Sequence, residues 1–438
     1  MKDYFFQLCE LVSKDIDDSF KSSFFLTAED SQFIRFSKGK VRQSGIVKDA
    51  SVSILLGKDQ KELSKSRRLT NHLETDVKNI KQALREMVSM IGFIPVNPFS
   101  IWPEEINNTE NVYEGNLINR DETVKKIVGD IGNIDLVGIY AGGKIYRGQV
   151  NSFGQKNWFE STNFNFDFSV YASNGLADKH SLSGECWDEK KYQDLILQSK
   201  DKVTLLEEDK KDIVAGKYDI YFSPAAVTDV VEYLNYGAFS KSNIEDKCSS
   251  FCQLMDKKVK LSNKVNLSNI VDSGFYQPFE IKGFVANNQV DLVKSGEMVG
   301  SLVSPRSSLE YNCKYNSNME YGCFLNLDGG KLENEKVLET LDTGIYISNL
   351  WYTNYSNLFN ARITGLTRYA CFWIENGKIQ APLNALRFDE SIFHMFGEGL
   401  EDFTKETFTT LNNSTYEQRS LGAISAPGAI VRDFNFCL

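Results

Sequence analysis

Residues 214–239 read VAGKYDIYFSPAAVTDVVEYLNYGAF, and this stretch decides how the second half of the chain folds. Residues 218–222 are rich in aromatic and branched side chains, which is typical of a strand. Ser223 is a helix-capping residue, and Pro224 suits the first turn of a helix. Apolar residues then recur at helical spacing, at Val227, Val230, Val231 and Leu234. The stretch therefore predicts a strand that runs directly into an amphipathic helix over residues 225–238.

The sequence before this junction mixes strand and helix patterns. Strand patterns occupy residues 33–55, with turns at residues 37–39 and 57–59, and residues 134–185. Helical patterns occupy residues 1–20, 71–92, 119–131 and 187–210. Strands and helices without a regular β-α-β order predict an α+β fold.

The sequence after residue 260 consists mostly of short apolar runs between polar turns, which indicates strands. Only 8 prolines occur in the 438 residues, and no low-complexity linker separates the two halves, so the junction near residue 210 is predicted to be tight. We therefore predict an N-terminal domain of mixed strands and helices over residues 1–210. A mostly antiparallel, β-rich C-terminal domain is predicted over residues 211–438.

Composition and charge exclude several classes of function. The net charge is −10, and a nucleic-acid partner requires a basic face, so we expect no nucleic acid. No run of 18 apolar residues occurs, so no membrane span is expected. The first residues lack the basic-then-apolar layout of a secretory signal, and the 8 cysteines are scattered. We expect a cytoplasmic protein with free thiols.

No segment carries a self-sufficient active site. In the helix after the Ser223 cap no histidine occurs, and Glu232 alone cannot hold zinc, which prefers three or four protein ligands. Cys248 and Cys252 would share one face of a helix, but no second pair or histidine lies close by in sequence. Cys371 lies within an alternating strand, which indicates sheet packing rather than a reactive thiol.

Four segments together carry a resemblance to a known family. They are the strand–turn–strand FIRFSKGKVRQSG at 33–45, YASNGL at 171–176, the region 344–391 and the ending SAPGAIVRDFNF at 425–436. The third contains Thr364-Gly365-Leu366-Thr367-Arg368, which reads as a turn, followed by IENGKI at 374–379. In this order, over almost the full chain, they resemble the TldD/PmbA family, also called TldD/TldE and modulators of DNA gyrase.

The resemblance implies a function that depends on a second chain. TldD-like members carry His-Glu-x-x-x-His on a helix after a strand, bind a metal and cleave peptides, whereas PmbA/TldE-like members lack these ligands. The matching places here hold Glu232, Tyr233 and Gly237, so the helix is read as a degenerate active-site helix. The resemblance implies a non-metallated subunit of a cytosolic metalloprotease complex that acts on unfolded peptides or peptide precursors.

The resemblance also implies where cofactor and substrate belong. No cofactor is expected in this chain, and zinc is expected in a TldD-like partner subunit. In this chain we expect no catalytic and no metal-ligating residue. Polar contacts to an extended peptide are expected from Thr364, Gly365, Thr367 and Arg368.

Two other functions remain open at this stage. The chain would also fit a stand-alone peptide-binding or scaffold homodimer without proteolytic activity. It would also fit an independent enzyme, such as a thiol hydrolase that uses Cys371 or Cys252. Neither the substrate nor the roles of Cys248 and Cys252 follow from the sequence. DNA binding has no physical support, because the chain is acidic and has no basic stripe.

Overall fold

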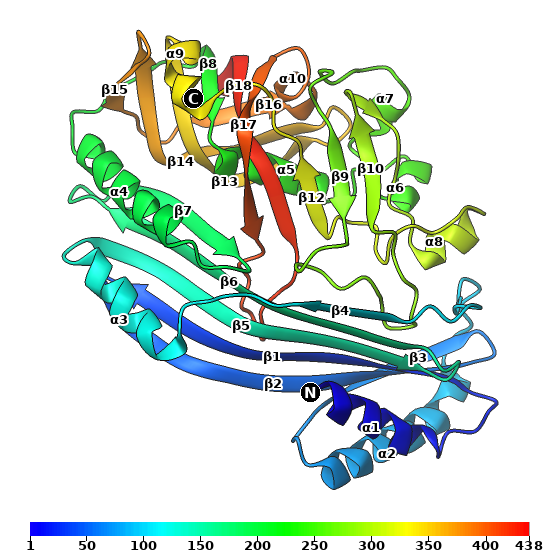
Figure 1. Cartoon of the computed structure of the whole chain (residues 1–438). Coiled ribbons are helices and arrows are strands. Elements are labelled where there is room, and N and C mark those ends of the chain that lie inside the picture. The colour runs from blue at the N-terminus through cyan, green and yellow to red at the C-terminus, as the bar shows by residue number, and fades with distance from the viewer. Residues whose placement is uncertain (438) are drawn as a thin grey trace.

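The computed structural model describes residues 1–437, which form two sheets with helices around them (Figure 1). The elements of the first half are α1 (Lys2–Ser13), β1 (Lys21–Ser37), β2 (Lys40–Lys58), β3 (Lys61–Arg68), α2 (Leu73–Met90), η1 (Ile91–Phe93), β4 (Thr109–Tyr113), α3 (Arg120–Ile131), β5 (Asp135–Asn151), β6 (Lys156–Tyr171), β7 (Ala177–Gly184) and α4 (Glu189–Leu206). The predicted turns after β1 and β2 and the predicted helices α2, α3 and α4 are confirmed.

The second half contains more strands and shorter helices. Its elements are β8 (Gly216–Phe222), α5 (Pro224–Leu234), α6 (Lys241–Glu245), α7 (Cys252–Met255), β9 (Leu267–Ile270), β10 (Gln289–Lys294), β11 (Glu297–Met298), α8 (Pro305–Glu310), β12 (Phe324–Leu327), η2 (Asn334–Lys336), α9 (Val337–Leu341), β13 (Gly344–Asn357), β14 (Arg362–Glu375), β15 (Lys378–Pro382), β16 (Arg387–Ser391), α10 (Ile392–Met395), β17 (Leu400–Leu411) and β18 (Ala423–Cys437). The predicted α+β class with a β-rich C-terminal part is confirmed.

The sheet of the first half is curved, and its two faces differ in chemistry. Its strand order is β3-β2-β1-β5-β6-β4, and β7 also pairs with β6. Alternate residues of β1, such as Phe24, Leu26 and Ile34, face the helices and are buried. α1 and α2 cover one end of this apolar face, and α3 and α4 cover the other. The opposite face is polar and turns toward the second half of the chain (Figure 1).

The polar face of the first sheet binds the second half through backbone carbonyls. Its side chains donate to backbone carbonyls in loops and in β17 of the second half: Ser23 to Ile281, Asn151 to Lys282, Gln155 to Gly283, Ser161 to Gly274, Asn165 to Leu411 and Ser183 to Thr409. Buried polar groups are costly unless they are hydrogen-bonded, so these partners allow a polar sheet face to be covered. The two halves therefore meet through a specific hydrogen-bonded surface.

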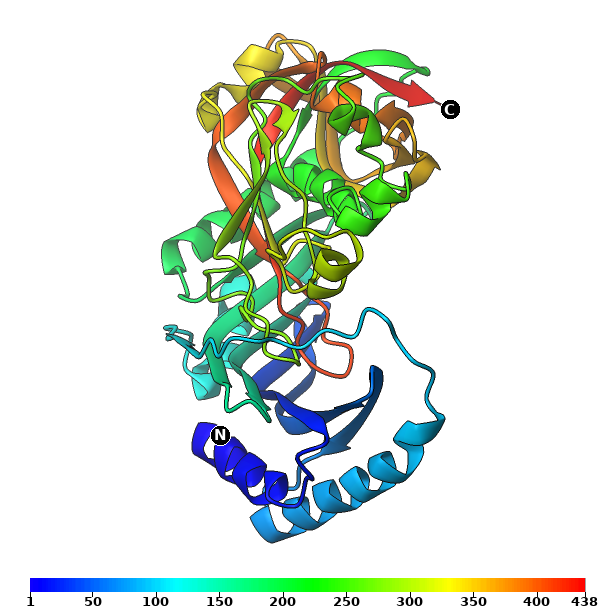
Figure 2. The same ribbon diagram turned by 90° about the vertical axis from the view of Figure 1, so that its right-hand side faces the viewer.

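The second sheet closes on itself around α5. β18 pairs with both β16 and β8, so the path β8–β13–β14–β16–β18 forms a ring. Most pairings are antiparallel, and β8 with β13 and β12 with β18 are parallel. The loop between β17 and β18, residues 412–422, extends away from this sheet and reaches the first half (Figure 2). Within residues 1–437, no helix is long and apolar enough to cross a membrane.

The predicted junction between strand and helix is confirmed at β8 and α5. Ser223 caps the helix, since its Oγ accepts from the backbone N–H of Ala226 at 3.3 Å, and Pro224 opens the first turn. The same hydroxyl donates to the carbonyl of Ser348 on β13. One serine thus fixes both the start of α5 and its position against the sheet.

Replacing this serine is expected to lower stability. Ser223→Ala removes the cap and leaves the Ser348 carbonyl without its buried donor, which costs about 1–2 kcal/mol of unfolding free energy. Urea denaturation followed by tryptophan fluorescence measures this change. An unfolding midpoint equal to that of the parent chain would contradict the capping role.

Candidate functional site

Helix α5 has one buried face and one face that borders a cleft. Val227, Val230, Val231 and Leu234 pack into the core of the second sheet. The opposite stripe of the helix carries Ala225, Thr228, Asp229, Glu232 and Asn235, which all line a cavity of about 330 Å³. The amphipathic pattern of the sequence therefore aims a polar helix face at a cavity.

Three parts of the chain that are far apart in sequence form this cavity, which we call the interdomain cleft. β6 and β7 of the first half contribute Asp167, Lys179, His180 and Ser181. α5 contributes the polar stripe described above. Other segments of the second half, including the ends of β17 and β18 and the loop between them, contribute residues 321–323, 410–413 and 421–424, together with Tyr276 and Asn349. The cleft therefore exists only when the two halves are assembled.

The cleft holds carboxylates whose charge is poorly compensated. Burial raises the pKa of Asp229 to about 7, although the backbone N–H of Leu350 donates to its Oδ2 at 2.8 Å. Burial also raises the pKa of Glu232, and its charge further disfavours ionisation of Asp229. Lys179 opposes this effect, but it is already paired with Asp167 at 2.9 Å. This wall of the cleft thus carries two carboxyl groups whose pKa values are raised, and that of Asp229 lies near neutral pH.

The raised pKa of Asp229 predicts a pH-dependent stability. Between its ordinary pKa of 3.8 and about 7, the folded chain keeps a proton that the unfolded chain releases, so this group's contribution to stability falls as the pH rises through that window. Asp229→Asn removes the effect and keeps an oxygen for the Leu350 N–H. We expect the Tm of the variant relative to the parent to rise by about 2 °C from pH 5 to pH 8. The same difference at both pH values would contradict the assignment.

The histidine that lines the cleft, His180, contacts a buried carboxylate. His180 Nε2 lies 2.6 Å from Asp178 Oδ2, and Lys202 Nζ lies 3.3 Å from the other oxygen of Asp178. The remaining histidines lie at the start of α2 and on α10, which are different parts of the fold. Burial raises the pKa of Cys323, which also lines the cleft, to about 12, so its thiol stays protonated. His180 therefore has a structural partner, and Cys323 is not a ready ligand.

Helix α5, which the sequence resemblance reads as a degenerate active-site helix, does not fit a catalytic metal. Glu232 borders the cleft, but Tyr233 packs against β13 and donates its hydroxyl to the carbonyl of Thr353. Gly237 has a φ of +95°, and a Cβ there would lie 2.0 Å from Asn243 Nδ2. Within the described residues 1–437, no three His, Cys, Asp or Glu side chains are grouped so as to hold a metal ion. A catalytic zinc takes three protein ligands, whereas this helix supplies the two carboxylates of Asp229 and Glu232 and no histidine.

Comparison with known proteins places the chain in a family. Residues 215–437, just over half of the chain, match the family model described as the PmbA/TldA metallopeptidase C-terminal domain. The chain belongs to the PmbA/TldD family. The family predicted from the sequence is thus confirmed. No curated protein sequence matches the chain.

Solved structures with the PmbA/TldD fold cover nearly the whole chain. TldE from Thermococcus kodakarensis has a TM-score of 0.80 at 13% identity, over 99% of this chain and 100% of that one. A protein named as a modulator of DNA gyrase from Thermotoga maritima has a TM-score of 0.74 at 13% identity, over 99% of both chains. One of the same name from Bacteroides thetaiotaomicron has a TM-score of 0.75 at 14% identity, over 99% and 98%. At these identities the likeness shows a shared fold.

The expected turn at residues 364–368 is wrong, because these residues lie inside β14. Thr364 pairs with Asn354 of β13, and Gly365 pairs with Phe388 of β16. The hairpin turn falls earlier, at residues 358–361. A Cβ at Gly365 would lie 2.7 Å from Thr353 Cγ2 and 3.0 Å from the Phe388 ring, so this glycine serves close packing.

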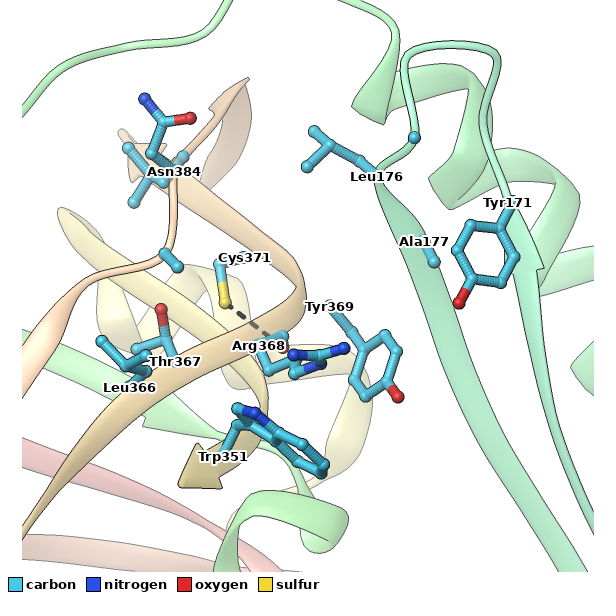
Figure 3. A pocket seen from close by; sticks show the side chains of 13 residues that line it. Tyr171, Leu176, Ala177, Trp351, Leu366, Thr367, Arg368, Tyr369, Cys371 and Asn384 are labelled. Atoms are coloured by element: carbon cyan, nitrogen blue, oxygen red, sulfur yellow. Dashed lines mark hydrogen bonds between the residues drawn. The ribbon is translucent and has the colours of Figure 1, made fainter. Parts of the chain in front are cut away.

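The four residues expected to contact peptide separate into two groups. Thr364 Oγ1 donates to the Phe388 carbonyl within the sheet, and Gly365 is packed as described. Thr367 and Arg368 line a second cavity, of about 200 Å³, between the two halves (Figure 3). Thr367 is buried, and its Oγ1 accepts from the Leu386 N–H, so only Arg368 presents a free polar group there. Whether any of them contacts peptide stays a prediction.

The cysteines occupy unrelated environments. Cys248 is exposed in the link between α6 and α7, whereas Cys252 is buried at the start of α7, so the two do not share a helix face. Cys371 is buried in β14 as predicted, and burial raises its pKa to about 11. A protonated, buried thiol is a poor nucleophile.

Sequence reasoning missed most of the cleft residues. Asp167, Lys179 and Asp229 carry no local motif, and their meeting depends on how the halves assemble. One signal was present: Asp229 and Glu232 stand three residues apart on the polar side of a helix whose other side is strongly apolar.

Proposed function

We propose that this chain is the non-metallated, peptide-binding subunit of a two-chain TldD/TldE-type metallopeptidase in the cytoplasm. The observation that carries the proposal is the wall of the interdomain cleft formed by α5. The fold directs this helix face into the cleft, yet its side chains are Asp229 and Glu232 without any histidine. The chain thus retains the position of a catalytic helix while offering groups suited to binding.

The peptide-binding role is supported by the walls of the cleft. It combines carboxylates, amides and backbone groups from both halves in a cavity of about 330 Å³. Such a surface suits an unfolded segment, which presents backbone donors and acceptors along its whole length. Acidic groups on α5 favour a segment with basic side chains or a free amino terminus.

The chemistry is assigned to a partner. A TldD-like chain with His-Glu-x-x-x-His would hold zinc, which activates water and polarises the scissile carbonyl. This chain would bind and orient the substrate, and no catalytic step is assigned to its residues. Unfolded peptides or peptide precursors are the substrate class.

Reconstitution tests the proposal. The chain, a His-Glu-x-x-x-His chain from the same genome and an equimolar mixture are each incubated with an unstructured peptide, with and without EDTA. We expect cleavage by the mixture, loss of cleavage with EDTA, and none by this chain alone. Cleavage by this chain alone in EDTA would contradict the proposal. Equal cleavage by the other chain with and without this one would favour a stand-alone peptide-binding or scaffold homodimer.

A further inference from the structure

The second cavity lies where the two halves face each other, and we call it the Arg368 pocket. The turn between β6 and β7 supplies Tyr171, Leu176 and Ala177 on one side (Figure 3). Trp351 of β13 and residues 366–369 of β14 lie opposite, with Cys371 and residues 383–385 completing the lining. The pocket therefore combines apolar side chains with one arginine, the amide of Asn384 and the hydroxyls of Tyr171 and Tyr369.

Arg368 is held by aromatic rings and has no acidic partner. Its guanidinium carbon lies 4.4 Å from the ring centre of Trp351 and 5.2 Å from that of Tyr369. Within residues 1–437, no carboxylate lies within ion-pair distance of it, whereas Arg362 on the same strand pairs with Asp389. Stacking occupies the faces of a guanidinium and leaves its in-plane N–H groups free. Arg368 is thus oriented for an anionic group that this chain does not supply.

A strained stretch of backbone beside Arg368 fixes the position of the Tyr369 ring against the guanidinium. Ile347 pairs with Cys371 and Asn349 with Arg368, so two residues of β14 bulge opposite one residue of β13. Tyr369 occupies the bulge with a φ of +60°, which is unusual for a bulky residue. Such strain is costly and clusters at binding sites. The bulge places the Tyr369 ring beside the Arg368 side chain (Figure 3).

The size of the pocket limits its occupant. Its volume of about 200 Å³ is below the range of about 300–1,000 Å³ usual for drug-sized ligands, so it suits a single side chain. Leu176, Leu366 and Leu383 make that space apolar. The C-terminal residue of a peptide carries both a free carboxylate and a side chain. It therefore matches a site that combines a planar cation with a small apolar space.

We infer that the Arg368 pocket binds the C-terminal residue of a peptide, with Arg368 pairing to the terminal carboxylate and the cavity taking an apolar side chain. This inference rests on the proposed peptide-binding function. It goes beyond that function by naming the end of the peptide that is recognised and the residue that recognises it.

Fluorescence anisotropy with labelled unstructured peptides tests the inference in EDTA. The peptides share one sequence ending in Leu, with either a free acid or an amide at the C-terminus, and a third amidated peptide carries an internal Glu. Charge-assisted hydrogen bonds predict that the free acid binds about 10-fold or more tightly than the amide. Arg368→Ala should reduce this preference below about twofold. Arg42→Ala, an exposed arginine on β2, is the control and should leave it unchanged.

Four outcomes of the binding experiment would contradict different parts of the inference. Equal binding of acid and amide would overturn the inference and leave the proposed function standing. Binding of the internal-Glu amide as tightly as the free acid would overturn the assignment to a C-terminus. A preference that persists in Arg368→Ala would overturn the role of Arg368. Absence of binding by every peptide would overturn the proposed function as well.

Discussion

Replacing Arg419 by alanine is expected to destabilise the chain by about 3–5 kcal/mol, because the side chain is a buried cation that joins the two halves. Arg419 lies on the loop between β17 and β18, and it donates to the carbonyls of Gly143 at 3.3 Å and Asn163 at 3.1 Å on the first sheet. Burial lowers its pKa to about 10, so it remains charged at neutral pH, and the nearby charge of Glu29 supports it. Its removal takes this donor from the two carbonyl groups and the nearby positive charge from Glu29.

A control variant shows whether the loss of stability is specific to Arg419 or follows from removing an arginine at any position. Arg306 on α8 is 62% exposed, forms an ion pair with Glu310 one turn away and lies over the Phe99 ring, so Arg306→Ala is expected to cost about 1 kcal/mol or less. Urea denaturation of both variants measures the difference. If Arg419→Ala unfolds at the same urea concentration as Arg306→Ala, the loop does not hold the halves together.

Replacing Gly237 by alanine is expected to cost about 2–3 kcal/mol. The φ of +95° suits glycine, and the added Cβ would displace the Asn243 side chain, whose Nδ2 lies 2.0 Å from the ideal Cβ position. This result bears on the proposed function, in which position 237 corresponds to the second histidine of the TldD-like motif. A site that rejects a methyl group does not present an imidazole.

Gly129→Ala is the control for this substitution. Gly129 lies inside α3, and an added Cβ would meet nothing within 4 Å, so the change should stabilise the chain by about 0.5–1 kcal/mol. Measured by thermal unfolding, the Tm of Gly237→Ala should therefore fall below that of the parent chain, and the Tm of Gly129→Ala should rise above it. Equal stability of Gly237→Ala and the parent chain would show that the end of α5 tolerates a side chain.

The parts of the fold that depend on local chemistry could be predicted from the sequence. The junction between β8 and α5 follows from the cap at Ser223 and the proline after it, and both act over a few residues. The turns after β1 and β2 and the helices α2 and α3 were predictable for the same reason. Each of these signals is complete within one stretch of chain.

The errors and omissions arose where packing between distant segments decides the role of a residue. Gly365 looked like a turn residue, but its missing side chain makes room for Thr353 and Phe388. Arg419 stands in a polar loop, and only the assembled structure buries it. The interdomain cleft joins residues near 170, 230 and 415, so no local pattern announces it. The role proposed for α5 comes from the family resemblance, since the residues alone left it open.

Zinc analysis of the purified chain tests the central claim most directly. The claim is that this chain binds substrate while a partner holds the metal. We predict less than about 0.1 zinc per isolated chain and about one zinc per pair when the chain is purified with a His-Glu-x-x-x-His partner. One tightly bound zinc per isolated chain, lost on Glu232→Gln, would contradict the account.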